Sequence, residues 1–319
     1  MPSAAPPRPV LPAAVSVLSA AVVGGEPVAA TVLGAHGPAL YLDVAGRVLP
    51  VVTADAVPLP TALRLAAASG RVEWGVVAGD VVPVGDGRVV LPGLELVVSR
   101  TWRPARVRRA TASTLTSRAI LPALLRDECA SARPDHHVRT HDGVHDGAGD
   151  DGDWLADGIR ALFSGVGCRT GRSGSHLGTR PGEGGCAEAV AALVGRGQGL
   201  TPSGDDALAG ALLVTHALGA AAPLATAVRA RLGATTAVSA ALLDAAADGF
   251  ATGDVVNLVD AALVGDDATV AAVLPAVLAI GHGSGRDLVT GITVTLDALA
   301  TRRVTTPAAE LTPSGRSVA

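Results

Sequence analysis

A short segment of the chain places glycines, hydroxyls and two carboxylates side by side. Residues 195–210 read GRGQGLTPSGDDALAG, and the sequence after Asp206 has the composition of a buried helix. Glycines can take positive φ, so the loop could turn its backbone N–H groups toward an anion. The N-terminus of a helix adds partial positive charge and unpaired amides. We therefore predict a phosphate-binding loop, with substrate contacts from Gly197, Gly199, Thr201, Ser203 and Gly204.

Two adjacent aspartates stand where this helix begins. Asp205 and Asp206 would repel an anion bound beside them unless a metal ion, an arginine or a proton intervenes. We predict that both are catalytic, and that Ser203 or Asp205 caps the helix. The structural alternative is that aspartate is simply favoured in a first helical turn, where it opposes the positive end of the helix dipole.

A second segment repeats the pattern. Residues 203–210 and 284–291 share serine, glycine, aspartate and glycine at equivalent positions, and both follow a glycine-rich loop. Two such helix starts could converge on one ligand, with the second contributing Ser284 to substrate binding. Its candidate catalytic residues are His282, Arg286 and Asp287, which could move a proton, clamp an anion or orient a nucleophile. Chance similarity, and structural pairing of His or Arg with the aspartates, are the alternatives.

These segments resemble the AllH-like family. Residues 197–210 match the family signature GxGLTPSGDDxLxG, and residues 281–291, GHGSGRDLVTG, are similar to its second motif, with Gly283 in place of a common serine. A weaker serine-bearing helical pattern includes Ser239, and a Trp-x-Pro motif surrounds Arg103. The resemblance implies that Ser239 and Arg103 also bind substrate.

The family's named member is a component of bacterial oxamate carbamoyltransferase, which acts in anaerobic allantoin breakdown. The resemblance implies a carbamoyltransferase that moves a carbamoyl group between oxamate and phosphate and is shared among several subunits. Its partners would be those subunits and small anionic metabolites, carbamoyl phosphate and oxamate. We assign no metal site and no certain cofactor, with Mg²⁺ as the one cofactor that the aspartates could hold.

Two other functions fit the same residues. Adjacent aspartates near a phosphate-type loop suit a magnesium-dependent phosphotransferase or phosphohydrolase, in which the ion bridges carboxylates and phosphoryl oxygens. A non-catalytic subunit would instead use the glycine loops to bind a metabolite for a partner enzyme. Metal-dependent activity would favour the first of these, and ligand binding without turnover the second.

The amino-acid composition excludes or disfavours several functional classes. The 319 residues are 49% hydrophobic, enough for large cores, but only 2% aromatic, so stacking on nucleic-acid bases is hard to arrange. The net charge of −4 also disfavours nucleic-acid binding. The chain contains no lysine, which excludes Schiff-base chemistry and the P-loop lysine and leaves arginine as the permanent cation.

Cysteine usage and the N-terminus bear on the compartment. Cys129, Cys168 and Cys186 are an odd, widely spaced set without CxxC, so neither a disulfide scaffold nor a structural zinc site is indicated. No apolar run is long enough to suggest a membrane span. The apolar stretch 10–24 raises the question of a signal peptide, but its basic region is weak. We predict a cytoplasmic protein without membrane or nucleic-acid partners.

The first hundred residues have a β-strand pattern. Short β-prone runs are bounded by Gly, Pro or Asp, at 28–33, 39–44, 47–52, 81–84, 88–91 and 94–99. Tight turns are expected at 45–46 and 85–87, and a helix over 60–69. The pattern predicts a small barrel or curled sheet. Tyr41 lies inside one strand, where packing is a simpler role than chemistry.

The middle of the chain is polar and basic. Arginines gather at the end of the β region, and they either face an anionic substrate or the acidic motif, or lie in solvent. A helix is expected near 115–126. Residues 127–153 are rich in His, Asp and Gly and read as an exposed or disordered insertion, where clustered histidines would form at most a loose metal site.

The rest of the chain is helical in pattern. Helices are expected at 154–163 and 186–194, separated by a glycine-rich stretch, and throughout 205–300. Pro223 and Pro275 are placed at helix starts, and a stripe of Val238, Leu242, Ala246 and Phe250 is expected in the core. We predict an α+β protein: a β-rich domain at 1–110, a linker helix and insertion at 111–153, an all-α domain at 154–303 carrying both motifs, and a flexible tail at 304–319.

Overall fold

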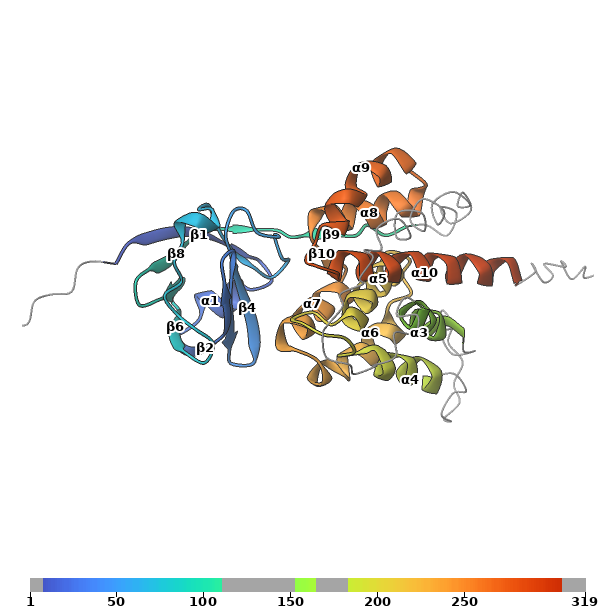
Figure 1. Cartoon of the computed structure of the whole chain (residues 1–319), viewed down its shortest axis with the longest axis horizontal. Helices are drawn as coiled ribbons and strands as arrows, with labels where there is room; N and C mark the ends of the chain where they lie inside the picture. The colour runs from blue at the N-terminus through green and yellow to red at the C-terminus, as the bar shows by residue number, and fades with distance from the viewer. Residues whose placement is uncertain (1–7, 111–152, 165–182, 306–319) are drawn as a thin grey trace, which may run out of the picture.

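The protein consists of a β-barrel followed by a group of packed helices (Figure 1). The computed structural model describes residues 8–110, 153–164 and 183–305. The predicted α+β architecture, with a β-rich N-terminal part and a helical C-terminal part, is confirmed. The predicted helix near 115–126, the His-rich insertion and most of the tail lie outside the described residues.

Eight strands close the barrel. They are β1 (Val10–Ser16), β2 (Val28–His36), β3 (Ala39–Val44), β4 (Arg47–Val52), β5 (Leu63–Leu65), β6 (Val81–Gly85), β7 (Arg88–Val90) and β8 (Glu95–Trp102). Their order around the barrel is β1-β5-β4-β3-β2-β6-β7-β8, and all neighbours are antiparallel except β1 with β8 and β4 with β5. A barrel of this size is just wide enough for side chains to fill, and here leucine and valine fill it.

The predicted strands and turns of the barrel are largely confirmed. The strands β3 and β4 form a hairpin in which Val44 lies opposite Arg47, on either side of the predicted turn. Ala45 and Gly46, at its tip, both have positive φ, as a tight hairpin turn of this kind requires. In the turn between β6 and β7, Asp86 and Gly87 also have positive φ.

Two stretches near the barrel differ from expectation. The helix predicted over 60–69 is wrong, because residues 63–65 form β5 between β1 and β4, and residues 69–71 form a single 3₁₀ turn, η1 (Ser69–Arg71). Pairing on both sides overrides the local helix preference of these residues. The apolar stretch 10–24 becomes β1 and the short helix α1 (Ala20–Gly24), so it is part of the barrel.

A short ribbon ties the barrel to the helices. After β8 the chain forms β9 (Ala105–Arg106), which pairs antiparallel with β10 (Phe250–Ala251). Arg106 donates from Nε to the Asp248 carbonyl at 2.8 Å, and Arg108 binds Asp260 through both its backbone N–H and its Nε. These two arginines of the junction therefore contact acidic or carbonyl groups of the helical part, and not the Asp205–Asp206 pair.

The helical part is arranged around two central helices. Its helices are α3 (Asp153–Ser164), α4 (Glu183–Leu193), α5 (Ser203–Ala217), α6 (Ala222–Arg229), α7 (Ala237–Ala247), α8 (Gly253–Val264), α9 (Asp267–Leu278) and α10 (Ser284–Thr305), with the 3₁₀ turn η3 (Leu232–Ala234) before α7. Nearly every residue of α5 is buried. Figure 1 shows α10 running along the helical part beside α5. Among the described residues, no helix combines the length and apolar character that a membrane span needs.

Some details of the helices differ from the sequence expectations. Pro223 does begin α6, but Pro275 lies inside α9, so its predicted place at a helix start is wrong. Neither Ser203 nor Asp205 caps α5; the capping position is Pro202, which makes no side-chain bond. The expected helices at 154–163 and 186–194 correspond to α3 and α4.

The two central helices touch through their backbones. A Cβ on Gly210 of α5 would collide with the Leu288 carbonyl of α10, and a Cβ on Gly291 of α10 would collide with the Ala207 carbonyl of α5. Glycine at both positions lets helix axes approach more closely than larger side chains allow. The repeated motifs of the sequence are therefore the two halves of one helix crossing.

This crossing predicts a large cost for a single methyl group. Gly210→Ala or Gly291→Ala should destabilise the protein by about 1–3 kcal/mol, the range typical of overpacking. Gly185→Ala is the matched control, because Gly185 lies in α4 with open space around it, and alanine there should be neutral or stabilising by about 0.5–1 kcal/mol. Chemical denaturation of the three variants measures both effects, and equal stabilities would contradict the crossing.

Candidate functional site

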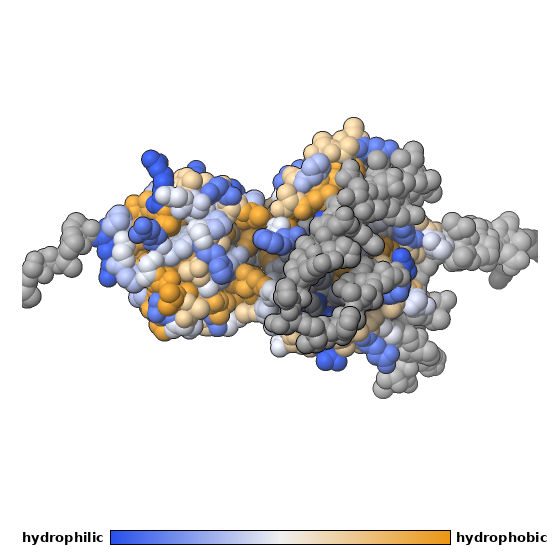
Figure 2. All heavy atoms as spheres, in the orientation of Figure 1, coloured by the Kyte–Doolittle hydropathy of each residue, from blue (hydrophilic) through white to orange (hydrophobic). Residues whose placement is uncertain are grey.

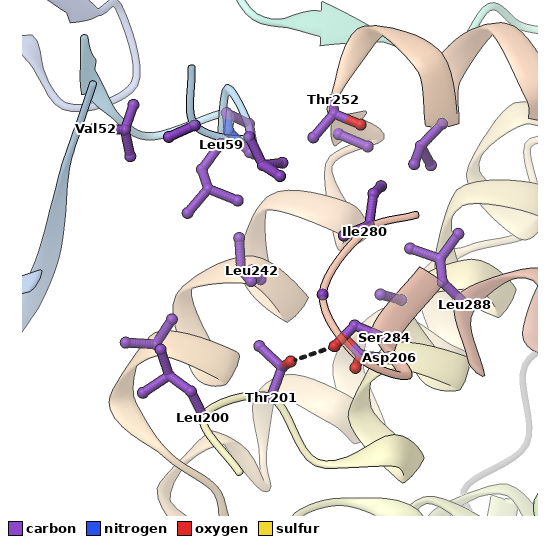
Figure 3. Close-up of a pocket in the computed structure, with 18 of the residues that line it drawn as sticks. Val52, Leu59, Leu200, Thr201, Asp206, Leu242, Thr252, Ile280, Ser284 and Leu288 are labelled. Atoms are coloured by element: carbon purple, nitrogen blue, oxygen red, sulfur yellow. Dashed lines mark hydrogen bonds between the residues drawn. The ribbon is translucent and has the colours of Figure 1, made fainter. Parts of the chain in front are cut away.

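A cavity of about 390 Å³ lies between the barrel and the helical part. One wall comes from β3, β4 and the loop 53–60 of the barrel, and the other from α5, α7, α8 and the start of α10. Most of the surface is aliphatic, as the labelled Val52, Leu59, Leu242, Ile280 and Leu288 show in Figure 3. On the face drawn in Figure 2, apolar residues also gather on the barrel beside the helical part.

The polar end of the cavity is built where the two helix openings meet. Asp206, from the first turn of α5, lies beside Ser284, the first residue of α10, and Thr201, from the loop before α5 (Figure 3). The Thr201 and Ser284 hydroxyls are hydrogen-bonded at 2.9 Å. The expectation that the two segments converge in space therefore holds for these residues.

Asp206 is the buried acid of this site. Asp206 is only 9% exposed, and its buried Oδ2 has no hydrogen-bond partner among the described residues. Burial raises the pKa of Asp206 to about 7; the nearby Ser284 and Thr201 hydroxyls oppose this rise, and the Asp287 and Asp205 carboxylates add to it. Asp206 can therefore exchange a proton near neutral pH.

Asp205 has a different environment. One oxygen accepts the Gly195 amide at 2.8 Å, and the other accepts the hydroxyls of Thr235 and Ser239, the latter at 2.7 Å. These bonds tie the glycine loop and the start of α7 to α5. Successive helical residues point about 100° apart, which is why neighbouring aspartates reach different surroundings. Asp205 holds the loop, and Asp206 faces the cavity.

The second opening mirrors the first. Gly204 and Gly285, which are equivalent in the two motifs, both donate their amides to a carbonyl of the preceding loop, Gly204 to Arg196 and Gly285 to Ile280. Ser203 lies beside Asp287 as Ser284 lies beside Asp206, so each serine serves the aspartate of the other motif. Burial raises the pKa of Asp287 as well, against the effects of Ser203 and Arg286.

The glycine loop is curled as its sequence predicts. Gly195, Gly197 and Gly199 all have positive φ. At the helix start, however, the Asp205 and Asp206 amides donate to the Pro202 carbonyl, and Gly204 donates to Arg196, so these three N–H groups are directed at carbonyl oxygens. Any anion contact by this loop would rely on other amides.

The remaining candidate residues lie outside the cavity wall. Gly197, Gly199, His282 and Arg103 are exposed, and Arg286 is half-buried beside Asp287. Ser239 is buried and donates to Asp205. The set that the structure brings together around the cavity is thus Thr201, Asp206 and Ser284.

Other cavity residues were not recognised as such from the sequence. The stripe of Val238, Leu242, Ala246 and Phe250 is expected in the core; Val238 and Ala246 are buried there, and all four residues also line the cavity. An apolar stripe looks the same whether it meets another helix or an enclosed space. Thr252, whose buried Oγ1 has no partner among the described residues, lies at another part of the wall and carries no motif that could have identified it.

The residues at the site were also assessed as metal ligands. Within the described parts of the chain, no group of three His, Cys, Asp or Glu side chains is arranged to hold a metal ion. Both oxygens of Asp205 already accept hydrogen bonds, so a cation near this site would depend on Asp206 and Asp287.

The raised pKa makes a prediction about stability and pH. The pKa of Asp206 is higher in the folded protein than the 3.8 expected on unfolding, so stability is greatest below that value and falls as the pH rises toward 7. Asp206→Asn cannot ionise and should be more stable than the parent at pH 8 by up to about 4 kcal/mol, with the difference shrinking at pH 5. Urea denaturation at both pH values measures this. A difference independent of pH would contradict it.

The neighbouring residue should behave in the opposite way. Asp205→Asn disturbs three hydrogen bonds in a buried place and should destabilise the protein by about 1–3 kcal/mol at pH 5 and pH 8 alike. The same denaturation series compares the two isosteric substitutions. A stability gain in Asp205→Asn would contradict its structural role.

Comparison with known proteins gives one match. The family model described as oxamate carbamoyltransferase subunit AllH matches residues 193–296, a range that contains the glycine loop, both helix openings and α7 through α9. No curated protein and no solved structure matches the chain. The matched range includes the helical residues at the polar end of the cavity. These residues, which make up less than half of the chain, are therefore similar to the oxamate carbamoyltransferase subunits that this family model describes.

Proposed function

We propose that the chain is one component of an oxamate-type carbamoyltransferase and that its cavity holds the carbamoyl or carboxamide group of the substrate. The observation that carries the proposal is the meeting of Asp206, Thr201 and Ser284 at one end of the cavity, inside the range that matches the family. A carbamoyl group presents N–H donors and a carbonyl acceptor. The unpartnered Asp206 oxygen accepts the first, and a hydroxyl donates to the second.

The proposed reaction moves the carbamoyl group from an oxygen of phosphate to the nitrogen of oxamate. The nitrogen of oxamate attacks the carbonyl carbon of carbamoyl phosphate, a C–N bond forms, the C–O bond to phosphate breaks, and the nitrogen loses a proton. A base with a pKa near 7 suits that proton transfer. In the opposite direction phosphate attacks oxalurate, and the same group returns the proton.

The negative charges of phosphate and oxamate need cations that the cavity wall does not contain. None of the described residues that line the cavity is arginine or histidine. Arg286 lies close by, beside Asp287. We infer that a second subunit supplies further cationic groups, as expected for an enzyme built from several chains.

A non-catalytic, metabolite-binding subunit is the second candidate. It is favoured by the position of His282 and Arg103, which are exposed and away from the cavity wall, and by the structural bonding of Asp205. Asp206 would then bind ligand for chemistry performed on another chain. The magnesium-dependent phosphotransferase has less support, because Asp205 uses both oxygens for hydrogen bonds within the chain.

The test is reconstitution with the products of neighbouring genes. We expect the complex to make oxalurate from carbamoyl phosphate and oxamate and the isolated chain to be inactive. In the complex, Asp206→Asn should lower kcat at least hundredfold and remove the rise in rate with pH near 7, while the exposed Asp254→Asn serves as control and keeps full activity.

The outcomes separate the two candidates. A raised KM with unchanged kcat in Asp206→Asn would favour the binding subunit over a catalytic role. Full activity of the variant in both constants would remove Asp206 from the reaction. Full activity of the isolated chain would contradict the multi-subunit arrangement.

A further inference from the structure

The cavity is more apolar than a substrate such as oxamate requires. About 390 Å³ has room for roughly a dozen non-hydrogen atoms, taking about 30 Å³ for a water-sized group. Oxamate alone would fill about half of that space, and carbamoyl phosphate could take the remainder, so it is the apolar lining that these two anions do not explain. Away from the polar end, the wall is made mostly by aliphatic and proline side chains, such as Leu242 and Val255 on the helical side and Leu59 on the barrel side, and Tyr41 and Asp55 also line the barrel side. The aliphatic part of this surface offers oxamate no polar partner.

Two polar atoms of the wall have no hydrogen-bond partner among the described residues. They are Asp206 Oδ2 and Thr252 Oγ1, and both are buried. In Figure 3 they lie at separate places, Asp206 with Ser284 and Thr201 on one side and Thr252 near the barrel loop on another. A buried acceptor without a partner is costly, and a ligand that donates to it removes that cost.

We propose that this cavity binds a neutral amide or ureide with a compact apolar body, whose N–H group donates to Asp206 and whose body fills the aliphatic space toward Thr252. The proposal rests on the proposed function for its carbamoyl-type head group and extends it to the rest of the substrate. The acceptor of the transfer would then be a neutral amide that carries an apolar group where oxamate carries its carboxylate.

Charge argues against the other ligand classes. A carboxylate or phosphate placed here would meet Asp206 with no cation among the described wall residues. An alkylammonium could pair with the buried Asp206 only at the cost of desolvating both charges, and the other acid of the wall, Asp55, is exposed. A neutral N–H donor satisfies the Asp206 oxygen without bringing a second charge into the cavity.

The test measures binding to the isolated full-length chain, with no turnover required. Titration calorimetry with acetamide, butanamide and hexanamide should show affinity rising up to about fourfold for each added methylene until the cavity is full. Hexanamide should bind at least tenfold more tightly than hexanoate, hexylamine or oxamate at pH 8.

Variants that fill the cavity from either wall provide the structural control. Leu242→Trp on α7 and Val57→Trp on the barrel loop should each weaken hexanamide binding at least tenfold. Val264→Trp, at an exposed position of α8 away from the cavity, should leave it unchanged. Thermal unfolding checks that each variant is folded, and two blocking positions on different elements guard against the loss of one.

Each outcome decides the proposal. Tighter binding of hexanoate or hexylamine, affinity independent of chain length, or equal binding by folded blocking variants would overturn it. Chain-length-dependent amide binding in a protein whose reconstituted complex transfers no carbamoyl group would support the cavity assignment and reject the proposed function. Transfer activity of the complex without any amide binding would support the proposed function and reject the cavity assignment.

Discussion

The backbone contact between α5 and α10 is the constraint on which the site depends. Gly210 and Gly291 face the carbonyls of the partner helix so closely that neither position has space for a methyl group. Gly204 and Gly285 make similar contacts with the Leu193 and Val277 carbonyls at the ends of the preceding helices. Four glycines thus fix both the crossing and the tight chain reversals that lead into it. The starts of α5 and α10 meet because the glycines at the crossing have no side chain that would separate the two helices.

The crossing explains why the two motifs exchange residues. In each motif the serine and the aspartate are three positions apart, nearly one helical turn, so both lie on the side that faces the other helix. Ser284 therefore reaches Asp206, and Ser203 reaches Asp287. The symmetry ends where the motifs differ. Arg286 stands in the second motif at the position of Asp205. Only the first motif is therefore bonded through this aspartate to the start of α7.

Local pattern predicted much of the fold. The barrel strands around Ala45–Gly46 and Asp86–Gly87 could be found because hairpin turns need positive φ and strands between them alternate or run apolar. The predicted helix at 60–69 failed for a different reason. Residues 63–65 pair with β1 and β4, which are distant in sequence, and no local signal contains that pairing. The sequence pattern predicts the described helices correctly where the apolar run is long.

The candidate site was predictable only in part. The repeated motif indicated that Asp206 and Ser284 approach one another, and the structure contains that approach. The barrel wall could not be inferred, since nothing in the sequence says which face of the barrel meets the helices. The stripe at Val238 and Leu242 was read as core for the same reason. Apolar periodicity reports that a face is buried, and not whether protein or ligand covers it.

The adjacent aspartates show how one helical turn can serve both stability and function. Asp205 is buried and accepts hydrogen bonds on both of its oxygens, so it stabilises the loop that carries Thr201. Asp206 is buried with one oxygen unmet, in a place where ionisation is disfavoured. A sequence selected for stability alone would replace such a residue, because a buried polar atom without a partner lowers the free energy of unfolding. Its presence at the junction of two glycine-fixed helix openings is therefore best explained by a ligand that completes its hydrogen bonds.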